Sequence, residues 1–327
     1  MTRLKNKVAI SLFATATLVP ASAFAEENDI VVTASGFEQP RNQTGQAITV
    51  IDKARLDQLQ ALSVGDVLQT LPSISVRQSG SLGSQTSVFI RGGNNSQTLV
   101  LVDGVRINDP STPNGAFDFG ALLVGNIGRV EVLNGPNSVI WGSQAMGGVI
   151  DVQTLPPASQ LSFNAAGEYG SHDTGALKAN ISGASGPVEA SLGGAWYSTE
   201  GISNLVGGSE KDGYHNISFN GRVKVHLVDN IAVDLRGYYN RGRNQYDDPF
   251  AGPDSLPETR NRQYVLYAGL NADLLDGRWK NRISYSRTDI NRLGTDPVAF
   301  SFNNFIVTGV VDRFEYHGDF KIMDALS

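Results

Sequence analysis

The strands expected in the second half of the chain constrain the fold most. From residue 158 onward, segments of about ten residues alternate strictly between apolar and polar side chains. The clearest segment sets Ile217, Phe219, Gly221, Val223 and Val225 on one face against Ser218, Asn220, Arg222 and Lys224 on the other. This length and alternation are typical of transmembrane β-strands that show one face to lipid and the other to a polar lumen.

The connections between these strands alternate in length. Eight candidate strands lie near residues 160, 176, 188, 216, 231, 263, 279 and 310. Short turns are expected at 184–187, 227–230 and 274–277, and long loops at 199–214, 241–261 and 288–308. An outer-membrane barrel has short periplasmic turns and long external loops, whereas a soluble β-sandwich has no reason to collect its long loops at one end. The pattern favours the barrel.

The first half, residues 26–157, predicts a compact α+β unit. Asp52 can cap a helix, and Ser63 with Asp66 resembles a capping box that opens a second helix, which Pro72 ends. Strands are expected at 74–77, 87–91, 99–103, 130–133 and 148–153. The pair Asp103-Gly104 between two apolar runs predicts a two-residue hairpin turn.

Residues 1–25 have the order of a secretory signal peptide. Arg3, Lys5 and Lys7 precede an uncharged run over 8–19, which is too short to span a bilayer, and Ala23-Phe24-Ala25 follows. We therefore expect export, with cleavage before Glu26.

Composition excludes several classes of function. After cleavage, 23 basic residues stand against 32 acidic ones, a balance of about −9 that argues against nucleic acid as a partner. The chain has no cysteine, so disulfides and thiol chemistry are excluded. Its four histidines, at positions 172, 215, 226 and 317, form no HExxH pair, and the GxSxG, GxxxxGK and GxGxxG motifs are absent. No enzymatic activity and no catalytic cofactor are expected.

Four blocks resemble the TonB-dependent outer-membrane receptors. They are DIVVTASG at 29–36, LPSISVRQ, FIRGGNNSQTLVLVDGVRIND and VEVLNGPNSVIWGSQAMGGVIDV. The resemblance implies a plug domain at 26–157 inside a barrel of twenty-two strands, of which 158–327 would supply about the first eight. It also implies an outer-membrane location, contact with lipid, insertion by the barrel-assembly machinery, and energy supplied through TonB. Within the family, the likeness is strongest to transporters of cobalamin (vitamin B12).

The resemblance assigns a TonB box to Asp29, Ile30, Val31, Val32, Thr33 and Ala34. An extended apolar run of this kind can add as a strand to the sheet edge of a partner protein. A buried first strand of the fold is the alternative interpretation, because strands often begin with β-branched residues.

The resemblance also implies ligand sites. Substrate contacts would come from Gln85, Ser87, Asn94, Thr112 and Pro113, and ordinary turn residues are the alternative. Calcium would bind in external loops to Glu210, Asp212, the Tyr246 carbonyl, Asp247 and Glu258. Ser203 stands where the cobalamin transporters have another Asp, which would weaken such a site, and solvated carboxylates are the alternative.

The expected function is energised uptake of cobalamin, with a ferric siderophore as the alternative substrate. A passive porin has no use for the N-terminal unit, and a soluble binding module does not explain the loops. Eight strands use about 21 residues each, so twenty-two would need on the order of 460. We therefore expect an incomplete barrel that neither assembles nor transports alone, because its edge strands would be unpaired in lipid.

Overall fold

The computed structural model describes residues 30–31, 36–37, 39–41, 44–248, 255–297 and 302–322. The expected signal peptide lies outside these residues, as do Asp29, Val32, Thr33 and Ala34 of the expected TonB box. Within the described ranges no helix is long and apolar enough to cross a membrane.

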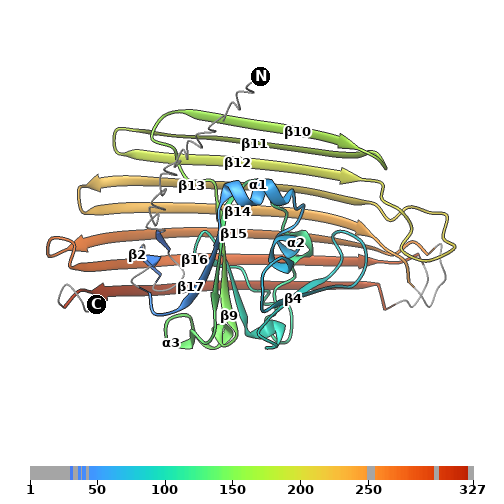
Figure 1. Ribbon diagram of the computed structural model, residues 1–327, viewed down its shortest axis with the longest axis horizontal. Coiled ribbons are helices and arrows are strands. Elements are labelled where there is room, and N and C mark those ends of the chain that lie inside the picture. Colours follow the sequence, from blue (N-terminus) through green and yellow to red (C-terminus); the bar gives the residue numbers. More distant parts are fainter. Residues whose placement is uncertain are drawn as a thin grey trace, which may run out of the picture.

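The second half forms one antiparallel sheet, here called the wall sheet, in which each strand pairs with the next along the chain (Figure 1). Its strands are β10 (Ser162–Gly170), β11 (Thr174–Ser185), β12 (Val188–Thr199), β13 (Tyr214–Val228), β14 (Ile231–Gln245), β15 (Glu258–Leu274), β16 (Trp279–Thr295) and β17 (Phe305–Phe320). The eight expected strands are therefore confirmed. The described sheet is open, with β10 and β17 at its edges.

Two of the long loops are shorter in the structure than the sequence predicts. The connections are 246–257 and 296–304 rather than 241–261 and 288–308, so that β14, β15 and β16 reach 15 to 17 residues. Cross-strand pairing continues through polar residues such as Arg243 and Arg260, which lie opposite each other. Hydropathy marks only the lipid-facing stretch of a strand, whereas backbone hydrogen bonding extends beyond it.

The two faces of the wall sheet show the reverse of the burial pattern in a water-soluble protein. Apolar side chains are exposed on the outer face, including Leu192, Phe219, Leu266 and Ile283. Polar side chains are buried on the inner face, including Asn180, Ser191, Asn216, Asn220 and Asn240. This is the expected arrangement for a sheet with lipid on one side and the N-terminal unit on the other.

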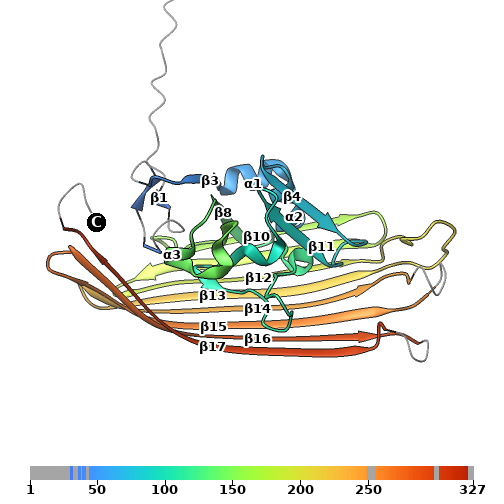
Figure 2. The ribbon, with the colours of Figure 1, turned by 90° about the horizontal axis from the view of Figure 1, so that it is seen from below.

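The N-terminal unit lies across the inner face of the wall sheet (Figures 1 and 2). A five-stranded sheet with the order β3-β8-β9-β6-β7 forms its centre, and β4 pairs with β5 beside it. Its strands are β3 (Ala47–Ile51), β4 (Ile74–Gln78), β5 (Thr86–Ile90), β6 (Thr98–Val102), β7 (Val105–Arg106), β8 (Ile127–Asn134) and β9 (Gly148–Thr154). Its helices are α1 (Lys53–Leu59), α2 (Val64–Gln69) and α3 (Ser138–Trp141), with short 3-10 turns η2 (Asn95–Gln97), η3 (Phe119–Ala121) and η4 (Ser143–Ala145).

The helix caps and the hairpin turn that the sequence predicts in residues 26–157 are confirmed. Asp52 caps α1 through the Arg55 amide, and Ser63 and Asp66 form the capping box of α2. Asp103 and Gly104 turn between β6 and β7 with φ of +50° and +75°, as the two-residue hairpin requires. The sequence interpretation omitted β3, which pairs with β8 at the edge of the central sheet.

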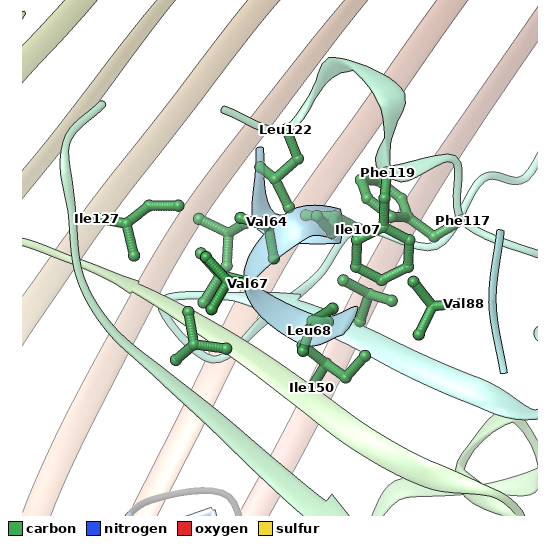
Figure 3. Close-up of a cluster of buried hydrophobic side chains, with 14 of the residues drawn as sticks. Val64, Val67, Leu68, Val88, Ile107, Phe117, Phe119, Leu122, Ile127 and Ile150 are labelled. Atoms are coloured by element: carbon green, nitrogen blue, oxygen red, sulfur yellow. The ribbon is translucent and has the colours of Figure 1, made fainter. Parts of the chain in front are cut away.

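A hydrophobic cluster holds α2 against the central sheet (Figure 3). Val64, Val67 and Leu68 of the helix belong to this cluster, and Leu68 lies beside Ile150 of β9. Phe117 and Phe119 complete it from the segment 117–122. The two phenylalanine rings meet edge to face with centroids 5.0 Å apart. This cluster fixes the position of the unit's loops, because it joins α2, the sheet and the segment at 117–122.

The opposite side of the central sheet buries carboxylates. Glu131 and Asp151 lie opposite each other on β8 and β9, each at most 1% exposed. Arg129 pairs with Glu131 at 2.9 Å, and the Gly104 amide donates to Asp151 at 3.0 Å. Burial, together with the charge of Glu131, raises the pKa of Asp151 to about 7.

This raised pKa predicts a pH dependence of stability. Between about pH 4 and pH 7 the folded state binds a proton at Asp151 that the unfolded state releases, so the free energy of unfolding should fall as pH rises through this range. In Asp151→Asn this part of the slope should disappear, while the exposed Asp57→Asn should keep it. Urea unfolding midpoints of the chain in detergent between pH 5 and pH 8 measure the slope. An unchanged slope in Asp151→Asn would contradict the assignment.

Candidate functional site

Three carboxylates meet at the long-loop end of the wall sheet. One oxygen each of Glu210, Asp212 and Asp247 lies within 4.8 Å of the others. The first two come from the loop 200–213, and Asp247 follows the end of β14. Asp212 is 3% exposed and Asp247 is 9% exposed, so the cluster is largely withdrawn from water.

The cluster is held by a turn of the same loop. Asp212 accepts hydrogen bonds from the amide and the side chain of Asn204, at 2.8 and 2.6 Å. Asp247 accepts from the Leu205 amide at 3.0 Å and from the Ser203 hydroxyl at 3.2 Å. Ser203, which stands where the resemblance predicts an Asp, thus donates a hydrogen bond to the cluster instead of adding a negative charge.

The arrangement suits a hard cation. The buried Oδ1 of Asp247 has no hydrogen-bond partner, although buried polar atoms normally have one. Burial raises the pKa of Asp212, and the neighbouring charge of Asp247 raises it further. A divalent cation would satisfy the free oxygen and offset the repulsion, and calcium favours such carboxylate oxygens.

The two remaining expected calcium ligands are placed differently. Glu258 begins β15, and its carboxylate pairs with Arg243 and Arg260 rather than joining the three-carboxylate group. Tyr246 directly precedes Asp247, and its amide donates to the Pro257 carbonyl at 3.2 Å. The structure therefore brings together three of the five expected ligands and places Tyr246 beside them in sequence.

A cavity of about 520 Å³ lies next to this cluster, between the N-terminal unit and the wall sheet. The loop 79–85 and residues 204–205 contribute to it, together with Asp118, Asn244, Tyr246, Asp247, Thr259, Asn261, Arg292 and Phe305. Asn204 and Leu205 both line the cavity and hold the carboxylates, so the two features share one turn.

Three charged side chains line the cavity, those of Asp118, Asp247 and Arg292. Among its described lining residues Arg292 is the only cation, and it lies 3.0 Å from Asp109 and 3.9 Å from Asp118. Burial raises the pKa of Asp118, which accepts hydrogen bonds from the amides of Thr86 and Gly120. Apart from the Asp247 carboxylate, the remaining polar side chains of the lining are neutral amides and hydroxyls, which can donate to or accept from an uncharged ligand.

Of the five expected substrate residues, Gln85 lines this cavity. Ser87 accepts a hydrogen bond from Asn95, and Asn94 caps η2. Thr112 donates to the Asp109 carbonyl at 3.0 Å, and Pro113 follows it in an exposed turn. These four residues are not among the lining of the cavity, and three of them make local loop contacts instead.

Sequence reasoning missed the contribution of the wall. Asn244, Asn261 and Arg292 stand on the inner face of β14, β15 and β16. Their position in the two-residue alternation could have identified them as inward-facing, but it could not show which inner residues the N-terminal unit leaves uncovered.

Residues 40–149 match the family model of the TonB-dependent receptor plug domain. The vitamin B12 transporter BtuB of Photobacterium profundum is 33% identical to this chain over 272 residues, which are 80% of the chain and 44% of that protein. BtuB of Vibrio vulnificus is 30% identical over 282 residues, 85% and 45% of the respective chains. The chain belongs to the TonB-dependent receptor family. It spans somewhat less than half the length of these curated relatives.

Solved receptors share the fold. The alcaligin outer-membrane receptor FauA of Bordetella pertussis superimposes with a TM-score of 0.66 at 19% identity, covering 88% of this chain and 46% of that one. The ferripyoverdine receptor of Pseudomonas aeruginosa gives 0.66 at 15% identity, covering 82% and 37%. The N-terminal unit is thus the plug, and the wall sheet corresponds to part of the receptor barrel. Members of this family are outer-membrane proteins that interact with TonB and bind substrates, and they are not enzymes.

The close packing of the plug loop 79–85 against Tyr214 predicts how much a substitution at Gly83 costs in stability. A Cβ on Gly83 would lie 2.2 Å from the ring of Tyr214, which is 2% exposed on β13, whereas a Cβ on Gly92 would meet nothing within 4 Å. Both glycines have positive φ, +83° and +73°. Gly92→Ala should therefore cost about 1 kcal/mol of stability for the left-handed backbone, and Gly83→Ala about 2–4 kcal/mol because overpacking is added. Denaturant unfolding of both variants measures the difference, and equal costs would show that the loop is not seated on Tyr214.

Proposed function

We propose that the plug and the wall sheet serve TonB-dependent uptake of cobalamin across the outer membrane, although these eight strands alone are too few to enclose the plug. In this proposal, residues 1–25 direct export and are removed before Glu26. Residues 29–34 then serve as the TonB box. The outer face of the wall sheet contacts lipid, and the barrel-assembly machinery inserts the wall.

The substrate proposal rests on the 520 Å³ cavity, whose described lining is rich in amides and hydroxyls and has one cation, Arg292, which is already paired. A corrinoid presents many side-chain amides, which pair with amide and hydroxyl groups such as those of Gln85, Asn244 and Asn261. An anionic ferric siderophore would need cationic partners, and Arg292 is already engaged by two carboxylates. The names of the curated relatives support the same substrate. The siderophore receptors among the solved structures are alike in fold, at 19% identity or less.

Binding measurements on the purified chain in detergent test the substrate. Cyanocobalamin should bind, and Gln85→Ala should weaken its affinity about tenfold, the effect of one lost hydrogen bond to a buried ligand. Gln58→Ala, on α1 away from the cavity, is the matched control and should bind like the parent chain. Binding of a ferric siderophore without binding of cyanocobalamin would overturn the cobalamin proposal and favour the alternative substrate.

We also propose that calcium binds Glu210, Asp212 and Asp247, with the Tyr246 carbonyl as a further ligand. Glu258 is left out of this set because two arginines already neutralise it. The support is the buried, unsatisfied Oδ1 of Asp247 within a group of three carboxylates. Bound calcium would fix the turn at 203–205, since that turn hydrogen-bonds to the same carboxylates.

Thermal unfolding with and without calcium tests this site. Calcium at a hundred times its Kd should stabilise the chain by about 2.7 kcal/mol, which raises Tm by several degrees. Asp212→Asn and Asp247→Asn should abolish the increase, whereas Asp276→Asn, in the turn at the opposite end of the sheet, should retain it. Equal stabilisation of all three variants would show that calcium acts elsewhere.

A further inference from the structure

Four arginines stand together on the outer face of the wall sheet at its long-loop end. Arg241 on β14 lies directly opposite Arg262 on β15, and Arg243 lies opposite Arg260, closer to the loop. All four residues are exposed. We call them the arginine patch, made of an inner pair (Arg241 and Arg262) and a loop-side pair (Arg243 and Arg260). Like charges placed opposite each other destabilise a sheet, so this arrangement does not serve the stability of the wall.

Aromatic side chains fix the depth of the patch along the strands. Tyr239 and Tyr264 form the opposite pair two residues closer to the middle of β14 and β15, with ring centroids 5.1 Å apart, and Phe219 of β13 extends the row, 6.3 Å from Tyr239. Toward the short turns the outer face continues with exposed apolar residues such as Leu235 and Leu266. In an outer-membrane barrel an aromatic row marks the boundary between hydrocarbon and headgroups. The inner pair, about 7 Å further along the strands, therefore lies at the level of the headgroups.

Carboxylates neutralise only part of the patch. Glu258, at the start of β15, pairs with both arginines of the loop-side pair. The inner pair forms no ion pair with a carboxylate of the described residues. The next acidic residue on this face is Asp289 of β16, which lies opposite Tyr264. Four arginines beside two carboxylates leave an excess of positive charge, and this excess is concentrated on the inner pair.

The inner pair has the chemistry of a phosphate site. The Arg262 guanidinium lies 5.1 Å from the centre of the Tyr264 ring, which holds its charge beside the aromatic row. Arg241 stands directly across from it, and such opposite residues have Cβ atoms within about 5.5 Å of each other. Two guanidinium groups this close can donate to one phosphate, each through two N–H groups. A phosphate would also offset the repulsion between them.

We propose that the arginine patch binds the phosphorylated headgroup of an anionic lipid in the leaflet at the long-loop end of the wall. The inner pair holds a phosphate, and the acyl chains lie along the apolar outer face beyond the aromatic row. Strands β14 and β15 lie in the middle of the wall sheet, so neighbouring strands flank the patch on both sides (Figure 1). This inference rests on the proposed contact of the outer face with lipid. It is independent of the substrate, because the cavity lies on the other face of the sheet.

Native mass spectrometry of the purified chain in a neutral detergent, titrated with diphosphoryl lipid A, tests the patch. The parent chain should bind this lipid. The double variant Arg241→Gln with Arg262→Gln should bind about ten to a hundred times more weakly, because charge-assisted hydrogen bonds to the phosphate are lost. Arg287→Gln is the matched control, since Arg287 is exposed on the same face of β16 and pairs with Asp312, and its affinity should stay within about twofold of the parent's.

Three results would overturn the proposal. The first is equal affinity of the parent and the double variant. The second is an equal loss in Arg287→Gln, because positive charge anywhere on the face would then explain the binding. The third is displacement of the lipid by an equal concentration of inorganic phosphate, which would identify a site for free phosphate rather than for a lipid.

Thermal unfolding in detergent without lipid checks that the double variant is folded. It should unfold at or above the temperature of the parent, since opposed like charges have been removed. If it unfolds at a lower temperature, Arg241→Lys with Arg262→Lys takes its place. This variant keeps both charges but loses the planar forks, so it should bind the lipid at least about threefold more weakly. An affinity equal to the parent's would again overturn the proposal.

Cyanocobalamin binding by the same chains separates this inference from the proposed function. If the double variant loses the lipid and keeps cyanocobalamin, the two sites are independent and both proposals are supported. If all chains bind cyanocobalamin and none binds the lipid, only the lipid site fails. If the parent binds the lipid but not cyanocobalamin, the lipid site stands and the substrate proposal fails.

Discussion

A strand in lipid must find every backbone hydrogen bond on a neighbouring strand, and this requirement governs the whole second half of the chain. It forces long antiparallel neighbours in sequence order, as in β10 to β17. Since side chains alternate across such a sheet, one face must be apolar and the other is free to be polar. The inner face is therefore a surface of amides, hydroxyls and arginines that a hydrophobic plug core could not cover favourably.

The plug meets this polar face with its own backbone. Asn216 and Asn240 both donate to the Ala121 carbonyl, at 3.3 and 3.1 Å. Gln263 donates to the Ile107 carbonyl and Thr288 to the Arg106 carbonyl, while Arg236 reaches the carbonyl of Asp103. Loop carbonyls that would otherwise be buried without partners are thus satisfied by the wall. The hydrophobic core shapes the plug, and these polar contacts determine where it sits.

Local physics made much of the fold predictable from sequence. The capping box of Ser63 and Asp66 and the turn at Asp103-Gly104 are decided by residues within three positions of each other, and both were found. The alternation of the strands is equally local.

The candidate site was harder to predict from the sequence because it depends on contacts across the fold. Glu258 was grouped with the calcium ligands by resemblance, yet its carboxylate is engaged by Arg243 on the neighbouring strand and by Arg260 two residues away. The cavity is bounded by the plug loop 79–85 and by wall residues far from it in sequence, and no pattern along the chain encodes that meeting.

One plug segment connects the cavity to a second set of contacts with the wall. Arg106 at the end of β7 contacts Trp141 of α3 and pairs with Glu315 of β17. Asp109 and Asp118, further along the same segment, hold Arg292 at the cavity. A ligand that drew Arg292 away from these carboxylates would leave them buried without their counter-charge, which is costly in a site of low dielectric. The segment could lower that cost by shifting, and Arg106 would shift with it. The polar contacts that position the plug thus give ligand arrival at the cavity a physical means to move Arg106 relative to β17.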